Sequence, residues 1–376
     1  MTTKLALIRQ RYRPDGGAER FISRALERLG SQELEVTVIT RKWQDQKGNF
    51  KVLTCNPTKW GRISRERGFA RQVCQLLEQH HFDLVQSHER LSCCDIYRAG
   101  DGVHKVWLEQ RKRILSPLQR KLLDLSPYHR YVCQAEKSMF ESHRLKAVIC
   151  NSHMVKEEIL ANFRLEPEKI SVIYNGIDTE VFTPALRDQF RQKRREEMEF
   201  NDQEIVAIFV GSGFERKGLE SAIRALSACE KPVRLIVVGT DKHLNHYQQL
   251  AVQLGVTVHW AGVQKDVRPY YAAADFLLLP TLYDPFPNVI FEAMACALPV
   301  ITSKKCGGAE LIKEGINGYT SDSLDITSIA NAISELDHPE RCLTMGDSAR
   351  QTVEAYSLDQ MGEQLTALYA HLLCRT

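Results

Sequence analysis

The stretch from Phe276 to Ile301 constrains the fold most, because it joins a buried strand, a loop and a helix within one short run. The apolar residues 276–279 predict a strand, and the prolines that follow predict a loop. Residues 289–297 then predict a short helix, and a new strand begins at Pro299. This order is typical of a parallel α/β sheet, in which ligands bind outside the carboxyl ends of the strands. The loop is therefore an expected ligand site.

Two acidic residues mark this loop and the helix after it. Asp284 lies in the loop, and Glu292 lies near the start of the helix, eight positions later. Both carboxylates can face one crevice and accept hydrogen bonds from sugar or ribose hydroxyls. Alternatively, they are acids near a helix start that the helix dipole favours. The spacing alone leaves both interpretations open.

The same stretch resembles the signature of the retaining glycosyltransferases of family 4, which reads Glu, seven residues, Glu, then Ala-Met-Ala-x-Gly-x-Pro-Val. Two positions depart from it, because Asp284 replaces the first Glu and Ala297 replaces the Gly. The resemblance implies an α/β GT-B fold, with two Rossmann-like doubly wound domains facing a central cleft. It also implies that Glu292 holds the ribose of a nucleotide sugar and Asp284 the sugar itself.

The rest of the chain alternates predicted strands and helices, which is typical of doubly wound parallel sheets. At 376 residues, of which 43% are hydrophobic, the chain is long enough for two domains. A charged run at 187–202 is predicted to be a helix or linker outside either core. We expect an acceptor-binding domain at 1–175, a nucleotide-sugar domain at 176–356, and a final helix at 357–376 that crosses back to the first domain.

Two glycine-containing turns are candidate phosphate sites. Gly16 and Gly17 precede a helix predicted at 18–29, and Gly213, Arg216 and Lys217 precede one predicted from Leu219. Free backbone N–H groups at a helix start, together with cations, suit a diphosphate. The turn at Gly16 and Gly17 does not match the fingerprint of a dinucleotide or ATP site. In the resemblance, Arg216 and Lys217 hold the diphosphate as it leaves. The predicted donor-binding residues are Gly16, Gly17, Gly213, Arg216, Lys217, Asp284, Asn288 and Glu292.

Two residues of the first half are candidates for contact with an acceptor. Asp101 lies between glycines in a Gly-Asp-Gly loop, where it either approaches a substrate or forms an ordinary Asx turn. His88 ends a predicted strand at the same edge of the sheet. The segment from Asp95 to Asp101 resembles one in the family members that add glucose to the heptose region of lipopolysaccharide. In that resemblance Asp101 is the general base or the acid that orients the acceptor.

Residues 104–131 mix basic and apolar side chains at helical spacing, which suits a helix lying on an anionic bilayer. A basic, solvated face over a stripe packed in the core is the alternative. Residues 1–175 carry 31 Lys and Arg against 20 Asp and Glu, so the first half is expected to meet something anionic. The basic residues assigned to the acceptor or membrane side are Lys105, Arg111, Lys112 and Arg113.

Composition excludes several other classes. No apolar run is long enough to span a bilayer and no signal pattern opens the sequence, so we expect a cytoplasmic protein, peripheral on the inner face of the membrane. The eleven cysteines include no Cys-x-x-Cys pair, which favours reduced core thiols over disulfides or zinc. No Asp-x-Asp occurs in the sequence, so neither a metal nor another cofactor is expected. We expect a monomer.

The resulting prediction is a retaining glycosyltransferase that moves glucose from UDP-glucose to a lipopolysaccharide core acceptor. One alternative is the same chemistry with another nucleotide sugar and a polyprenyl-linked or capsular acceptor. A second is a non-catalytic module that binds anions or nucleic acid, although aromatic residues are not regularly interleaved with the cations as base stacking requires. A third alternative is an epimerase that works on the nucleotide sugar alone.

Overall fold

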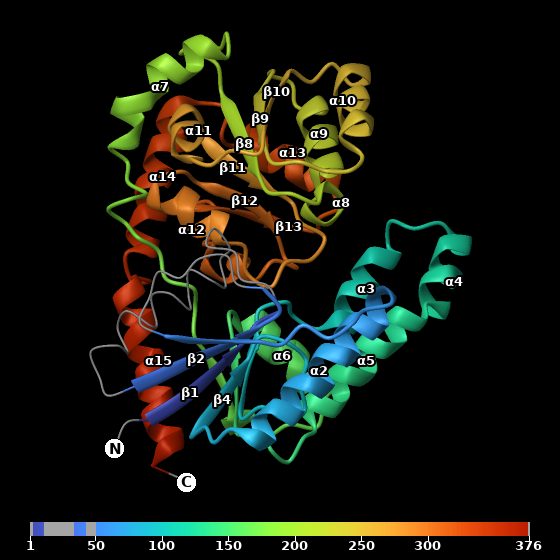
Figure 1. Cartoon of the computed structure of the whole chain (residues 1–376). Helices are drawn as coiled ribbons and strands as arrows, with labels where there is room; N and C mark the ends of the chain where they lie inside the picture. The colour runs from blue at the N-terminus through green and yellow to red at the C-terminus, as the bar shows by residue number, and fades with distance from the viewer. Residues whose placement is uncertain (1–2, 11–33, 43–49, 375–376) are drawn as a thin grey trace. The chain divides into compact units, whose positions relative to one another are not determined.

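The structure is a computed structural model that describes residues 3–10, 34–42 and 50–374 (Figure 1). The predicted glycine turn at Gly16 and Gly17 and the helix predicted at 18–29 lie outside these residues. The chain divides into two compact units. Unit 1 comprises 1–176 and 358–376, and unit 2 comprises 177–357.

Unit 1 is built on a seven-stranded sheet with the order β3-β2-β1-β4-β5-β6-β7, and every neighbouring pair is parallel. Its strands are short and consist largely of buried aliphatic residues, as expected when helices cover both faces. The strands are β1 (Thr3–Ile8), β2 (Leu34–Thr40), β3 (Lys51–Thr54), β4 (Leu84–Ser87), β5 (Ile96–Ala99), β6 (Ala147–Cys150) and β7 (Ile170–Val172).

Helices pack on both faces of this sheet. Ile96 belongs to the core cluster that includes Leu365 of the last helix, while the ring of its neighbour Tyr97 meets Phe140 edge-on at 5.4 Å. Successive strand residues point to opposite faces, so the last helix covers one face and the helix of Phe140 the other. The helices of unit 1 are α2 (Gly61–Gln79), α3 (His104–Lys112), α4 (Pro117–Leu125), α5 (Pro127–Phe140), α6 (His153–Asn162) and α15 (Leu358–Leu373).

Unit 2 has a six-stranded parallel sheet with the order β10-β9-β8-β11-β12-β13. From β8 the sheet grows in both directions, with β9 and β10 on one side and β11, β12 and β13 on the other. This is the doubly wound topology that the sequence predicts. The strands are β8 (Val206–Val210), β9 (Arg234–Val238), β10 (Val258–Gly262), β11 (Phe276–Leu279), β12 (Val300–Ser303) and β13 (Gly318–Ser321).

One helix of unit 2 precedes its first strand, and the others follow its strands. The chain enters and leaves this unit side by side, where Ile177 forms a bridge with Ser357. The prediction of two doubly wound α/β domains is therefore confirmed. The helices are α7 (Leu186–Glu197), α8 (Phe214–Lys217), α9 (Leu219–Ser227), α10 (Leu244–Gln253), α11 (Arg268–Ala273), α12 (Asn288–Ala295), α13 (Ile326–Ser334) and α14 (Pro339–Val353).

The prediction that the charged run 187–202 lies outside either core is wrong. Helix α7 packs on α11, and its Arg195 is fully buried. Arg195 donates to Asp275 at 2.7 Å and to the backbone oxygens of Ala273 and Glu204 at 2.9 Å each. A buried guanidinium is tolerated only when its donors are matched by such acceptors. The run therefore contributes the charged side chain of Arg195 to the interior, together with the apolar side chains of Met198 and Phe200.

The preference for reduced cysteines is wrong for one pair. Cys74 of α2 and Cys93, in the connection between β4 and β5, form a disulfide. No spacing signal predicts this disulfide, because the two cysteines lie 19 positions apart and no motif joins them. The other nine cysteines are free thiols, and most of them are buried, as predicted.

Ala297, which departs from the family signature, has the backbone conformation that normally calls for glycine. Its φ is +56°, and it is the second residue after α12. Its N–H donates to the Met294 carbonyl, and the N–H of Leu298 donates to that of Ala293. This is the left-handed helix ending in which a Cβ is disfavoured. Ala297→Gly is therefore expected to raise the free energy of unfolding by about 1 kcal/mol, measured by urea denaturation. An unchanged or lower stability would contradict this account, and Ala228→Gly, at the ordinary helical end of α9, should be destabilising instead.

Candidate functional site

The turn after β8 carries the two cations predicted to bind a diphosphate. It is helical, since residues Phe214–Lys217 form α8, and the N–H of Phe214 donates to Asp241 at 2.9 Å. Gly218 then separates α8 from α9 at φ +79°, and a Cβ there would meet the Pro280 carbonyl oxygen at 1.9 Å. Only glycine allows this close approach. The turn is thereby pressed against the loop that follows β11.

Arg216 and Lys217 converge on one carboxylate of that loop. Arg216 Nη1 lies 2.8 Å and Lys217 Nζ 2.7 Å from the same oxygen, Oδ2 of Asp284. The loop is also fixed by the backbone, because the Arg216 carbonyl accepts from Leu282 N–H at 2.9 Å. The adjacent Arg216 and Lys217 and the distant Asp284, all predicted donor-site residues, thus form one ion-paired cluster.

The cluster holds two cations but one carboxylate, so its charges do not balance. Burial by itself would raise the pKa of Asp284, but Lys217 and Arg216 outweigh burial and hold that pKa below its ordinary value. Lys217 is nearly buried, whereas the Arg216 side chain keeps 38% of its surface exposed. Two cations against one carboxylate leave a net positive charge, and Arg216 can present it to an incoming anion. Fixed cations of this kind stabilise the charge that develops on a leaving diphosphate.

Of the remaining predicted donor residues, Gly16 and Gly17 lie outside the described residues, and the other three lie on neighbouring elements of unit 2. Gly213 precedes α8 at φ +79°, and Asn288 is the first residue of α12. Glu292, one turn further along α12, is buried and accepts a hydrogen bond from the Tyr271 hydroxyl at 3.0 Å. Tyr271, on α11, was not predicted. Only the packing of α11 against α12 reveals it.

Asp101 follows β5 in unit 1 and is exposed. Its carboxylate lies 3.7 Å from Arg90, which in turn pairs with the buried Glu136 of α5 at 3.0 Å. Glu136 also accepts the backbone N–H of His104, at the start of α3. Sequence reasoning missed Arg90 and Glu136, because neither belongs to a motif and the fold alone brings them to Asp101.

The other acceptor-side candidates lie in different surroundings. His88 follows β4 and is buried, and its Nε2 lies 3.2 Å from the side-chain amide nitrogen of Gln86. Burial lowers the pKa of His88 well below the ordinary value, so the ring is neutral. Lys105 is exposed on α3, as is Arg113 at its end. Arg111 and Lys112 occupy the last turn of α3, where cations complement the helix dipole. The structure therefore separates His88, an interior residue, from the basic helix.

Two family models match this chain. Residues 15–181 match Glycosyltransferase Family 4, and residues 190–352 match Glycosyl transferases group 1. Between them the models account for nearly all of the chain outside its last helix. The protein is therefore a glycosyltransferase that joins these two domains, as the signature around Glu292 implied.

Its particular likeness is to an enzyme of lipopolysaccharide synthesis. The lipopolysaccharide glucosyltransferase WaaG of Escherichia coli (strain K12) is 27% identical over 321 residues, which cover 82% of this chain and 83% of WaaG. The crystal structure of WaaG matches with a TM-score of 0.82 at 24% identity, over 97% of this chain and 99% of that one. The predicted GT-B fold is thus confirmed.

Other relatives have different substrates in their names. The D-inositol 3-phosphate glycosyltransferase of Corynebacterium glutamicum (strain R) is 25% identical over 397 aligned residues, 94% of this chain and 91% of that protein. The Anabaena protein HepE, solved in complex with UDP-glucose, has a TM-score of 0.72 at 19% identity, over 98% of this chain and 99% of its own. WaaG and the D-inositol 3-phosphate glycosyltransferase share the class of enzyme in their names but not the substrate, and HepE shares the fold.

Proposed function

We propose that this enzyme transfers glucose, with retention of configuration, from UDP-glucose to a heptose of a lipopolysaccharide core. The observation that carries the proposal is the cluster in which Asp284 holds Arg216 and Lys217 at 2.8 and 2.7 Å. The likeness to WaaG supports the acceptor, and the complex of HepE with UDP-glucose supports the donor.

Unit 2 binds the donor in this proposal. The diphosphate lies against the Arg216 guanidinium and the turn that begins at Gly213, and the ribose hydroxyls donate to Glu292. Asp284 keeps both cations in place through Oδ2, and its second oxygen accepts from a hydroxyl of the glucose. Because Arg216 and Lys217 supply the positive charge, the reaction needs no metal ion.

The reaction replaces one bond at the anomeric carbon of glucose by another on the same face. The acceptor oxygen forms a bond to the anomeric carbon. The bond between that carbon and the diphosphate oxygen breaks at the same time, and UDP leaves with its electron pair. The acceptor proton passes to a phosphate oxygen of the leaving UDP. Arg216 and Lys217 stabilise the charge that builds on the diphosphate, and this is the largest contribution the site makes.

Unit 1 binds the acceptor. Asp101 orients the acceptor hydroxyl, and Arg90 and Glu136 hold the loop of Asp101 in place. His88 lies beneath the surface and supports the same edge of the sheet. Lys105, Arg111, Lys112 and Arg113 favour an anionic membrane surface, which brings a lipid-borne acceptor to unit 1.

The side chains of α4 support this membrane contact. Leu118, Leu122 and Leu125 recur at helical spacing and are 70%, 61% and 54% exposed, whereas Leu123 is the buried residue of that helix. A stripe packed in the core would be covered, so the structure favours the bilayer interpretation of residues 104–131 over the alternative. None of the helices that the structure describes is long and apolar enough to cross a membrane. In this proposal the exposed leucines and the basic residues place the enzyme at the periphery of the inner face of the cytoplasmic membrane.

A panel of nucleotides tests the donor. UDP at 100 times its Kd should stabilise the protein by about 2.7 kcal/mol, a shift of a few degrees in Tm. GDP and ADP at the same concentration should shift the Tm by less. Differential scanning fluorimetry measures this directly, and stronger stabilisation by GDP would refute UDP-glucose as the donor. Equal stabilisation by all three would indicate that the diphosphate alone is recognised.

A further inference from the structure

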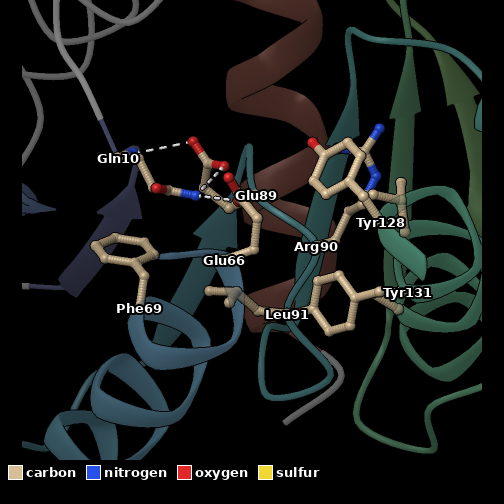
Figure 2. Close-up of a pocket in the computed structure, with 10 residues that line it drawn as sticks. Gln10, Glu66, Phe69, Glu89, Arg90, Leu91, Tyr128 and Tyr131 are labelled. Atoms are coloured by element: carbon tan, nitrogen blue, oxygen red, sulfur yellow. Dashed lines mark hydrogen bonds between the residues drawn. The ribbon is translucent and has the colours of Figure 1, made fainter. Parts of the chain in front are cut away.

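A narrow pocket in unit 1 is assigned no role by the reaction described so far. Figure 2 shows it between the ends of β1 and β4 on one side and helices α2 and α5 on the other. Strands β1 and β4 are parallel neighbours, so the pocket opens at the carboxyl edge of the sheet, where this fold class binds ligands. The lining residues are Gln10, Glu66, Phe69, Glu89, Arg90, Leu91, Tyr128, Tyr131, Val132 and Ala135.

The polar wall of the pocket is held in one arrangement. The side-chain amide of Gln10 donates to both Glu66 and Glu89, and its backbone N–H donates to Glu89 at 2.9 Å. The side-chain oxygen Oε1 of Gln10 accepts from Arg41 Nε at 3.1 Å, which fixes the orientation of the side-chain amide. Each carboxylate can accept about four hydrogen bonds, so Glu66 and Glu89 retain capacity for donors of a ligand.

The charge of the pocket selects against anions. Glu66 and Glu89 contribute two carboxylates, and Arg90 contributes the cation among the lining residues. The Arg90 guanidinium is already shared with Glu136 and Asp101. Arg65 pairs with Glu66 at 2.8 Å, and Arg9 lies 3.9 Å from Glu89. A phosphate would therefore face two carboxylates whose neighbouring cations are already paired, whereas hydroxyl groups could donate to the carboxylates.

The size of the pocket selects against a whole sugar ring. Its enclosed volume is about 20 Å³, which holds one or two water-sized groups. A short arm that bears two hydroxyls matches that space, provided that the ring from which it extends stays outside. Arg90 lines the pocket and also contacts Asp101, so the ring of such a ligand would lie beside Asp101.

We propose that this pocket is a specificity subsite that takes the exocyclic diol of the acceptor sugar, with Glu89 and Glu66 accepting its hydroxyl hydrogens. A heptose carries such a diol on its pyranose ring, and a hexose has only one hydroxyl there. The subsite therefore selects a heptose over the matching hexose, and an unphosphorylated arm over a phosphorylated one. This inference rests on the proposed function, because it names the part of the acceptor that unit 1 recognises.

The test compares two synthetic acceptors that differ only in their terminal residue, a heptose or a mannose, with UDP-glucose as the donor. The parent enzyme should prefer the heptose in kcat/KM by at least about tenfold, the effect of hydrogen bonds to a charged group. Glu89→Gln should reduce that preference toward unity. Glu157→Gln, an exposed acid on α6, is the matched control and should leave it unchanged.

A second variant keeps the proposal testable if Glu89→Gln fails to fold. Ala135→Leu keeps a good helix former on α5 and fills the pocket from its own wall, so it should also abolish the preference while transfer to mannose persists. If both folded variants retain the heptose preference, or if the parent uses the two acceptors equally, the subsite is refuted and the pocket holds only water. If the parent uses neither acceptor, the proposed function fails, and the subsite fails with it.

Discussion

Arg216→Ala is expected to lower kcat about 100- to 1,000-fold, which is the usual cost of removing one group that stabilises a developing anion. Arg216 suits this test because its side chain is partly exposed and its partner Asp284 keeps Lys217 at 2.7 Å. The fold should therefore survive, and the thermal stabilisation by UDP should fall along with turnover. Transfer of labelled glucose from UDP-glucose to the acceptor, measured at a saturating concentration of the donor, gives kcat.

Arg224→Ala is the matched control for Arg216. Arg224 lies on the next helix, α9, where it pairs with Glu220 at 2.8 Å on the surface, and such a pair contributes little to stability. Its loss should leave the rate within a factor of two. If the folded Arg216→Ala enzyme kept the parental kcat, Arg216 would not stabilise the leaving diphosphate, and the proposed role of the cluster in the mechanism would be wrong.

Asp101→Asn gives a complementary result that separates the two units. Asp101 belongs to unit 1, so UDP stabilisation should remain at the parental level while transfer to the acceptor is lost. The two variants therefore differ in the nucleotide measurement and agree in the transfer measurement. If UDP binding were lost in Asp101→Asn, the assignment of Asp101 to the acceptor would be wrong.

The sequence predicted the fold class well because local patterns determine it. The aliphatic run before Asp284 is a buried strand, β11, and the residues after that acid form helix α12, as the alternation predicts. Parallel strands in a sheet covered on both faces are nearly continuous apolar runs, so they are visible without knowledge of their neighbours. The departure at Ala297 is informative as well. The helix ends there in a left-handed conformation with φ of +56°, and this conformation accounts for the glycine that the family has at this position.

What could not be predicted depends on contacts between residues far apart in sequence. Arg216 and Asp284 are each recognisable from motifs, but their ion pair depends on how the turn after β8 meets the loop after β11. Arg90 and Glu136 lack any motif, and the disulfide of Cys74 joins two elements that no pattern relates. A sequence pattern gives the residue types and the elements that carry them. The partners of a charged side chain come from the tertiary fold.

The α4 stripe leads to the second large effect. The triple variant Leu118→Gln, Leu122→Gln and Leu125→Gln is expected to weaken binding to anionic phospholipid vesicles at least about 100-fold. Burial of a leucine in an apolar phase is worth about 1.5 to 3 kcal/mol, and all three leucines are more than half exposed in the free protein. Glutamine retains a helix propensity close to that of leucine, so α4 should persist. Vesicle co-sedimentation at several salt concentrations measures the affinity.

The basic residues and the leucines should contribute in distinguishable ways. Attraction of Lys105 and Arg113 to anionic lipid is screened by salt, whereas burial of leucine is not, so the triple variant should retain weak binding that disappears as salt rises. A matched control replaces three exposed apolar residues of unit 2, Val252, Ile316 and Leu343, by glutamine, and it should bind vesicles like the parent. Should the control lose as much affinity as the α4 variant, general surface hydrophobicity would explain the binding, and α4 would have no special part in it. Turnover on a soluble acceptor should be unaffected in the α4 variant, because the donor cluster of Asp284 lies in the other unit.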